Sequence, residues 1–375
     1  MLLKFPDNFY WGTATSAYQV EGGIRNNWSA AGEKFDAGIA CDHYHRFEED
    51  FDLAKGMNNN AHRFSIEWAR IEPVEGKFNE TEIEHYRQVI LALKKRGLEP
   101  LVTLHHFTLP NWFSEKGHWL NIGAPEYFAR FVEKMASEYK ELVRFWITIN
   151  EPNIYTTHSF LRGDWPPFKK SFYITQQIAK TLIESHKKSY EIIHKIVPDA
   201  QVGIASFNTH YGGILKLFSD YYWNHQFLQA IRDYQDFIGL NYYLSHYLFS
   251  ALKLSNKEKT DMGWEIRPKE IQYVLGALKQ YNKPIYITEN GLADAKDEKR
   301  EKFIESHLEG VHKAISEGVD VKGYFHWSLL DNFEWDKGFE PRFGLVEIDY
   351  KTLKRIPRPS SVKYAEICKN NSIKI

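Results

Sequence analysis

Eight short runs of apolar and β-branched residues recur along the chain, and segments with helical periodicity separate them. The runs are residues 9–14, 61–66, 100–105, 145–149, 201–206, 236–241, 284–288 and 321–327. Eight strands that alternate with helices favour a parallel sheet that closes on itself inside a ring of helices. We therefore expect an α/β fold, a (β/α)8 TIM barrel, formed as a single domain by residues 1–375.

Helical patterns between these runs support the barrel. Residues 80–96 carry apolar side chains at helical spacing and end at Gly97, and a proline in the first turn opens a helix at residue 124. Residues 172–197 and 297–318 predict two more helices. Because no linker or low-complexity segment interrupts the series, the sequence indicates one domain rather than several.

Charge and cysteine content exclude several classes of partner. The net charge is −1 and the isoelectric point is near 7, so no overall electrostatic attraction favours nucleic acid or an anionic membrane. Cys41 and Cys368 form neither a disulfide framework nor a metal-ligand spacing. The N-terminus does not resemble a secretory signal, and no run of about 18 apolar residues predicts a membrane span. We expect a cytoplasmic protein.

Polar residues gather where the predicted strands end. Functional side chains of such barrels lie at the carboxyl ends of the strands. The chain places there Gln19, His105, His106, Asn150, Glu151, Asn208, Asn241, Tyr242, Tyr243, Glu289, Asn290 and Trp327. This distribution predicts an active site at one rim of the barrel.

Glu151 and Glu289 each follow a predicted buried strand. A buried carboxylate costs several kcal/mol unless it is paired or used, so a glutamate at a strand end favours a position in a cleft. Two facing carboxylates without a metal-ligand set are typical of glycosidic bond cleavage. Retaining enzymes hold the pair roughly 5 Å apart and inverting enzymes hold it farther apart, and this separation cannot be read from a sequence.

Eight motifs carry a specific resemblance. They are FYWGTATSAYQ (9–19), ACDHYHR (40–46), RFSIEW (63–68), TLHHF (103–107), NEP (150–152), GLNYY (239–243), ITENG (287–291) and WSLLDNFEW (327–335). In this order they resemble the retaining β-glycosidases of glycoside hydrolase family 1, which include β-glucosidases, β-galactosidases and β-mannosidases. The resemblance extends from about residue 4 to residue 366, and residues 103–110 and 163–167 are similar to an archaeal-type subgroup.

The resemblance implies roles for named residues. Glu289 is expected to be the nucleophile and Glu151 the acid/base, with Arg63 and Asn241 in support. The implied substrate-binding residues are Gln19, His106, Asn150, Tyr243, Trp327, Glu334, Trp335 and Phe343. The implied reaction is removal of a terminal β-linked sugar from a small β-glycoside or oligosaccharide, with a β-glucoside favoured over a β-galactoside, β-mannoside or β-fucoside. No cofactor or metal is implied, and a homo-oligomer is left open.

Several positions depart from the family pattern. Phe107 stands where tryptophan is usual and Phe339 where tyrosine is usual. The chain is also shorter than is usual, between residues 22 and 41 and between residues 208 and 236, from which we expect a more open cleft. The carboxylate of Glu334 argues against a 6-phosphosugar, because like charges would repel.

Simpler roles are available for some of these residues. Arg63 could neutralise Glu67, Trp327 and Trp335 could be core residues, and Glu151 could stabilise a helix N-terminus. His43 and His45 have the spacing of a metal-binding pair but open a helix, and we assign His105 to structure. Two alternative functions also stay open: a transglycosidase that uses the same intermediate, and a carbohydrate-binding pseudoenzyme.

Overall fold

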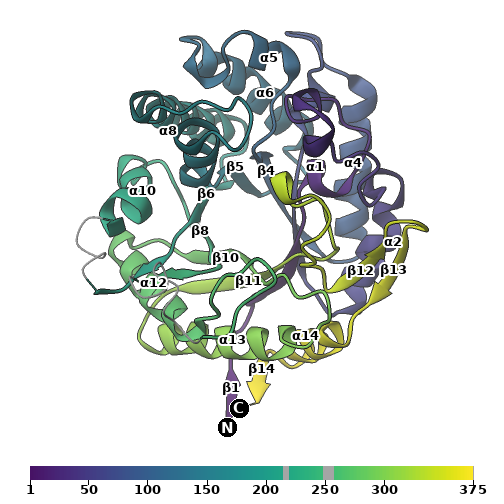
Figure 1. The fold of residues 1–375 in the computed structure, drawn as a ribbon, viewed down its shortest axis with the longest axis vertical. Coiled ribbons are helices and arrows are strands. Elements are labelled where there is room, and N and C mark those ends of the chain that lie inside the picture. The colour runs from purple at the N-terminus through teal and green to yellow at the C-terminus, as the bar shows by residue number, and fades with distance from the viewer. Residues whose placement is uncertain (214–218, 248–256, 375) are drawn as a thin grey trace.

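A computed structural model describes residues 1–213, 219–247 and 257–374. Eight parallel strands close into a barrel in the order β10-β11-β2-β3-β4-β5-β6-β8 (Figure 1). The strands are β2 (Tyr10–Ala14), β3 (Ala61–Ser65), β4 (Glu99–His105), β5 (Phe145–Asn150), β6 (Gln201–Phe207), β8 (Ile238–Asn241), β10 (Ile285–Asn290) and β11 (Val321–Trp327). All eight predicted runs form these strands, so the predicted (β/α)8 barrel is confirmed.

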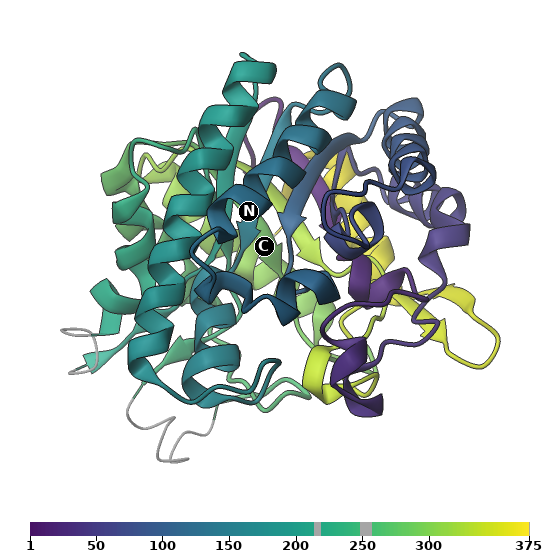
Figure 2. The same cartoon turned by 90° about the horizontal axis from the view of Figure 1, so that it is seen from above.

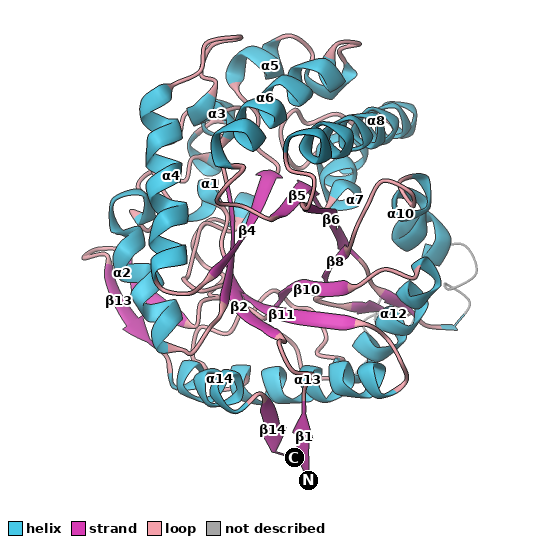
Figure 3. Cartoon of the chain, turned by 180° about the vertical axis from the view of Figure 1, so that it is seen from behind, coloured by secondary structure: helices cyan, strands magenta, loops and turns pink. Residues whose placement is uncertain are grey.

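Helices surround the barrel, as Figure 3 shows from the opposite side and Figure 2 shows from above. One follows each strand: α2 (His43–Gly56), α4 (Glu80–Lys95), α6 (Ala124–Tyr139), α8 (Phe172–Ile196), α10 (Gln226–Ala230), α12 (Ile271–Leu278), α13 (Arg300–Ser316) and α14 (Pro359–Asn370). Helix α13 begins three residues later than expected. Asp297 has a positive φ of 59° and forms an ion pair with Arg300, so it belongs to the preceding loop.

Shorter helices and strand pairs complete the rim and the termini. The short helices are α1 (Ala17–Val20), α3 (Trp68–Ile71), α5 (Asn111–Glu115) and α7 (Pro152–Thr156). Strand β1 (Leu2–Lys4) pairs with β14 (Ser372–Lys374), which brings the two chain ends together (Figure 1). A β12 (Val346–Asp349) and β13 (Lys354–Pro357) hairpin precedes α14, and β7 (His210–Tyr211) pairs with β9 (Ser245–His246).

Two hydrophobic clusters stabilise the barrel. The inner one includes Leu101, Phe145, Ile147, Tyr286 and Phe325, which fill the barrel interior. The outer one lies between strands and helices and is larger. Alternate strand residues point to opposite faces, so a strand that is apolar throughout supplies both clusters. Among the residues that the structure describes, no helix has the length and apolar character that a membrane crossing requires.

Candidate active site

A cavity of about 610 Å³ lies at the carboxyl ends of the barrel strands. Ten of the twelve predicted site residues line it: Gln19, His106, Asn150, Glu151, Tyr243, Glu289, Trp327, Glu334, Trp335 and Phe343. The other two, Arg63 and Asn241, are buried behind the wall and contact the glutamates. Residues that are far apart in the sequence thus meet at the rim that the sequence predicted.

Glu151 directly follows β5 and precedes α7. Its φ of 42° is in the left-handed region, and its backbone N–H donates to the Ala205 carbonyl at 2.7 Å. The side chain does not cap α7; its Oε1 accepts a hydrogen bond from Asn241 Nδ2 at 2.7 Å. The carboxyl group therefore faces the cavity rather than stabilising a helix end.

Glu289 lies near the end of β10 between a cation and a phenol. Arg63 Nη1 donates to its Oε1 in a buried ion pair, and Tyr243 Oη donates to its Oε2 at 2.6 Å. The alternative pairing of Arg63 with Glu67 is wrong, since the Glu67 carboxyl group accepts from Thr108 Oγ1 at 2.8 Å instead.

Irregular strand pairing turns Asn150 and Glu289 toward the cavity. The register of β5 shifts between Ile147 and Asn150, and the register of β10 shifts between Ile287 and Asn290. Such irregularities re-aim side chains and are frequent beside active sites. With strict alternation from the inward-facing Tyr286, Glu289 would point to the helices; the shift lets it face the barrel axis.

Gly291 allows the end of β10 to lie against the end of β11. A Cβ atom at this position would be 1.8 Å from the Trp327 carbonyl oxygen, which is far inside contact distance. A side chain would therefore separate the two strand ends that carry Glu289 and Trp327. This contact requires glycine at the second position after Glu289.

The surroundings of the two glutamates give them different proton affinities. Burial, and then the nearby charge of Glu289, raises the pKa of Glu151 well above its ordinary value. Burial also raises the pKa of Glu289, but Arg63 and the Tyr243 hydroxyl oppose this rise. Glu289 is thus the carboxyl group that ionises first and Glu151 the one that keeps its proton.

Asn150 joins the glutamates to His106. Its Oδ1 accepts from Arg63 Nη2 at 2.7 Å and from Asn241 Nδ2 at 3.1 Å, so its Nδ2 is directed to His106 Nε2 at 3.2 Å. Burial, with Arg63 as the next cause, holds the pKa of His106 well below its ordinary value. His106 is therefore a neutral ring that accepts at Nε2.

Gln19 and Glu334 form a polar patch on the opposite wall. Gln19 Nε2 donates to Asn332 Oδ1 at 2.9 Å, to the Phe333 carbonyl at 2.9 Å and to Glu334 Oε2 at 3.3 Å. Burial, Glu289 and Asp336 raise the pKa of Glu334 to about 8. A protonated carboxyl and an amide can both donate to and accept from sugar hydroxyls.

Aromatic rings form the cavity floor. The rings of Trp327 and Trp335 lie nearly parallel to that of His106, with centroids 6.1 and 6.0 Å away. Both tryptophans line the cavity, so they are not core residues only. Phe107 also lines it, whereas Phe339 packs against Phe333 and Tyr350 outside the lining. Phenylalanine in place of tyrosine at position 339 therefore changes packing within the loop and not the cavity wall.

The other histidines that the sequence analysis considered, His43, His45 and His105, do not line the cavity. His105 is buried between Trp119 and Tyr155 on the helical side of β4, as its structural assignment predicts. His43 bonds to Asp50 and the exposed His45 bonds to Asp42. Within residues 1–213, 219–247 and 257–374, no group of three or more His, Cys, Asp or Glu side chains is arranged to hold a metal ion.

Sequence reasoning missed the outer wall of the cavity. Its apolar part consists of Ile154, Phe207, Trp223, Leu244, Met262 and Trp264, and its polar part includes Thr157, His158, Arg162, Asp164 and His246. The strand-end rule could have found Phe207 and Leu244, which lie at or just beyond the ends of β6 and β8. Ile154 lies on α7 and Trp223 on a short helical segment (Tyr221–His225), whereas Met262 and Trp264 lie on a loop whose path a sequence does not reveal. Residues 214–218, in one of the shortened segments, are outside the described residues.

Comparisons with known proteins identify the family of the chain. The model of glycosyl hydrolase family 1 matches residues 1–212 and 222–373. The 1,4-beta-D-glucan glucohydrolase of Thermotoga neapolitana is 33% identical over 440 residues, with 99% of each chain covered. This alignment is longer than the 375-residue chain, as expected for a shortened member.

Solved structures give the same result. The beta-glycosidase from Pyrococcus horikoshii is 39% identical with a TM-score of 0.92, and the alignment covers 100% of this chain and 97% of that one. The beta-glucosidase from Thermotoga maritima in complex with castanospermine is 32% identical with a TM-score of 0.91, and both chains are covered completely. The chain therefore belongs to glycosyl hydrolase family 1 and is a glycoside hydrolase.

Proposed function

We propose that this enzyme is a retaining exo-β-glycosidase in which residues 1–375 act as one catalytic domain. The observation that carries the proposal is the unequal environment of the two glutamates. Glu289 has a guanidinium and a phenol as partners, which suit an ionised nucleophile, whereas Glu151 has one amide donor and stays protonated. One carboxylate and one carboxylic acid are what the first step of double displacement requires.

In the first step, a Glu289 oxygen attacks the anomeric carbon while Glu151 gives its proton to the glycosidic oxygen. The bond from the anomeric carbon to the leaving group breaks, and an ester with Glu289 forms. Asn150 is held by Arg63 and Asn241, so its position is fixed before the sugar binds. Such preorganisation lowers the barrier because no reorganisation is needed during the reaction.

The ester changes the proton affinity of Glu151. Once Glu289 is neutral, its repulsion of the Glu151 charge disappears and the pKa of Glu151 falls. Glu151 then removes a proton from water, which attacks the anomeric carbon and releases Glu289 as a carboxylate. Arg63 and Tyr243 stabilise that returning negative charge.

We place the sugar against Gln19, Glu334 and the tryptophan floor, and the leaving group along the apolar outer wall. Trp264 contacts both Tyr243 and Phe343, so this wall begins beside the nucleophile. A β-glucoside is the preferred substrate that we propose, and the names of the Thermotoga relatives support it.

The proposal is tested with a panel of p-nitrophenyl α- and β-glycosides, the wild-type enzyme and Glu289→Ala with and without azide. We expect hydrolysis of β-glycosides only, and an α-glycosyl azide from the variant. A β-glycosyl azide would contradict the assigned nucleophile. Product analysis at high acceptor concentration identifies a transglycosidase, and a folded wild type that binds sugars without turnover would identify a pseudoenzyme.

A further inference from the structure

We infer that Asp331, which lies outside the cavity wall, is a positioning residue that holds the sugar-binding loop in its working geometry. The loop, residues 328–345, follows β11 and carries Glu334, Trp335 and Phe343. The inference rests on the proposed function, because it concerns how the sugar is held. It adds a residue that touches neither the cavity nor the glutamates.

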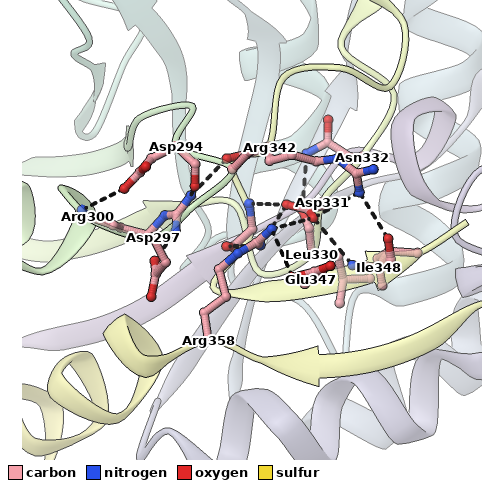
Figure 4. Close-up of polar contacts among 12 residues, drawn as sticks. Asp294, Asp297, Arg300, Leu330, Asp331, Asn332, Arg342, Glu347, Ile348 and Arg358 are labelled. Atoms are coloured by element: carbon pink, nitrogen blue, oxygen red, sulfur yellow. Dashed lines mark hydrogen bonds and ion pairs between the residues drawn. The ribbon is translucent and has the colours of Figure 1, made fainter. Parts of the chain in front are cut away.

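Asp331 is completely buried and both of its carboxylate oxygens have several partners (Figure 4). Arg358 donates to both oxygens at 2.9 Å, in a bidentate pair. Arg342 Nη1 donates to Oδ2 at 3.2 Å, and the Gly344 backbone N–H donates to Oδ1 at 2.9 Å. Burying a carboxylate costs desolvation free energy, and charge-assisted hydrogen bonds must offset that cost. The groups that donate to Asp331 are therefore held firmly in place.

These contacts close the loop at its base. Asp331 and Gly344 stand at the two ends of the segment that carries Glu334 and Trp335, and their backbones nearly touch. A Cβ at Gly344 would lie 2.2 Å from the Asp331 backbone nitrogen. The distance between Asp331 and Gly344 therefore determines where Glu334 and Trp335 lie relative to the cavity.

The base is directly connected to the sugar-binding patch. Asn332, the residue after Asp331, accepts from Gln19 Nε2 at 2.9 Å, and the Phe333 N–H donates to the Gln19 carbonyl at 3.0 Å. On the other side of the base, Phe343 precedes Gly344 and lines the cavity. A shift of Asp331 would thus move both edges of the sugar site.

The same base is bonded to the loop that follows the nucleophile strand. The Arg342 carbonyl accepts from the Asp294 N–H at 3.0 Å and from Arg300 Nη2 at 2.8 Å, beside the Asp331 cluster in Figure 4. Asp294 lies five residues after Glu289. The cluster therefore sets the sugar-binding loop relative to the strand that carries Glu289.

The chain offers a matched control in Asp50. This carboxylate is also completely buried and forms a bidentate pair with Arg355 at 2.8 and 3.0 Å. The pair joins α2 to β13, and neither Asp50 nor Arg355 lines the cavity. Asp50→Asn thus removes an equivalent buried charge that bonds to no residue of the loop directly. Its link to the base is indirect, because Arg355 Nη2 donates to the Cys41 carbonyl at 2.7 Å and Cys41 Sγ donates to the Asp331 carbonyl at 2.8 Å.

The test compares Asp331→Asn with Asp50→Asn in hydrolysis of p-nitrophenyl β-D-glucoside. Misplacement by about 1 Å can cost about a hundredfold in rate. We expect Asp331→Asn to lower kcat/KM by about ten- to a hundredfold, mainly through KM, and Asp50→Asn to change it by less than about twofold at a similar loss of Tm. In a Glu334→Ala background, the effect of Asp331→Asn should be smaller, because part of it acts through Glu334 and residues that act through one another are not additive.

Equal fold-losses with and without Glu334, or unchanged kinetics in Asp331→Asn, would overturn the inference. If Asp331→Asn does not fold, Arg358→Lys is measured instead, since it keeps the charge but loses the bidentate pair. A wild-type enzyme without turnover would refute the proposed function but not the role of Asp331. Calorimetric binding of castanospermine to the same variants would then test Asp331, with a tenfold weaker affinity expected and an unchanged affinity contradicting the inference.

Discussion

The hydrogen bond from Tyr243 to Glu289 gives the most direct test of the assigned nucleophile. Tyr243→Phe removes one hydroxyl that donates to Oε2 at 2.6 Å in a buried site and leaves the ring in place. A hydrogen bond to a charged group contributes about 1.5–3 kcal/mol, and one pKa unit corresponds to 1.36 kcal/mol. The loss should therefore raise the pKa of Glu289 by about 1–2 units.

The assay is the pH profile of kcat/KM with p-nitrophenyl β-D-glucoside, stopped with alkali at each pH. Glu289 acts as a carboxylate, so activity is lost as the pH falls through its pKa, and a higher pKa moves the acidic limb upward by about 1–2 pH units. The alkaline limb follows Glu151 and should move less, because the variant keeps the Asn241 bond to Glu151.

Tyr242→Phe is the matched control. The neighbouring Tyr242 is also buried, but its hydroxyl bonds to Ser245 at 2.9 Å and to the Arg267 carbonyl at 3.1 Å. This variant should change stability and leave the acidic limb in place. An acidic limb within a few tenths of a unit of the wild type in Tyr243→Phe, or an equal shift in the control, would refute the reasoning.

Three further predictions concern single residues. Glu151→Ala should reduce kcat/KM far more for methyl β-D-glucoside than for 2,4-dinitrophenyl β-D-glucoside, because a good leaving group needs no proton; equal losses would exclude Glu151 as the acid. The pKa of Glu334 is about 8 in the folded protein against 4.5 ordinarily, so stability should fall as the pH rises through this window. Because Glu334 is partly exposed, solvent screens part of the effect; Glu334→Gln should flatten Tm between pH 5 and 8, and an unchanged slope would contradict this. Gly291→Ala should cost about 1–3 kcal/mol or more in denaturant unfolding and reduce activity, because its Cβ meets the Trp327 carbonyl; wild-type stability would contradict the close contact.

The barrel was predictable because its signals are local. Each strand is a short apolar run, and each helix has its own periodicity and end signals, so the order of elements determines the topology. The predicted start of a helix was wrong where a tertiary contact determines the residue at which the helix begins. Helix α13 was expected from Asp297, but this carboxylate accepts from the Ser360 backbone N–H at 2.9 Å and belongs to the loop.

The positions of the site residues at one rim were also predictable, because parallel strands all end on the same side. The partners of these residues were not. From the sequence alone, Arg63 had two possible partners, Glu67 and Glu289, and the structure pairs it with Glu289. Residues 226 positions apart form this pair, and a single sequence carries no signal for such a contact.

The sequence by itself determined the barrel, its active rim and, through its motifs, the family. Only the tertiary structure decided which way the glutamates face and how they differ. The register shifts that turn Asn150 and Glu289 inward depend on pairing with neighbouring strands, so alternation along one strand does not reveal them. The unequal proton affinities arise from burial, from Arg63 and from Tyr243, and these act through space across a low-dielectric interior that only the closed barrel creates.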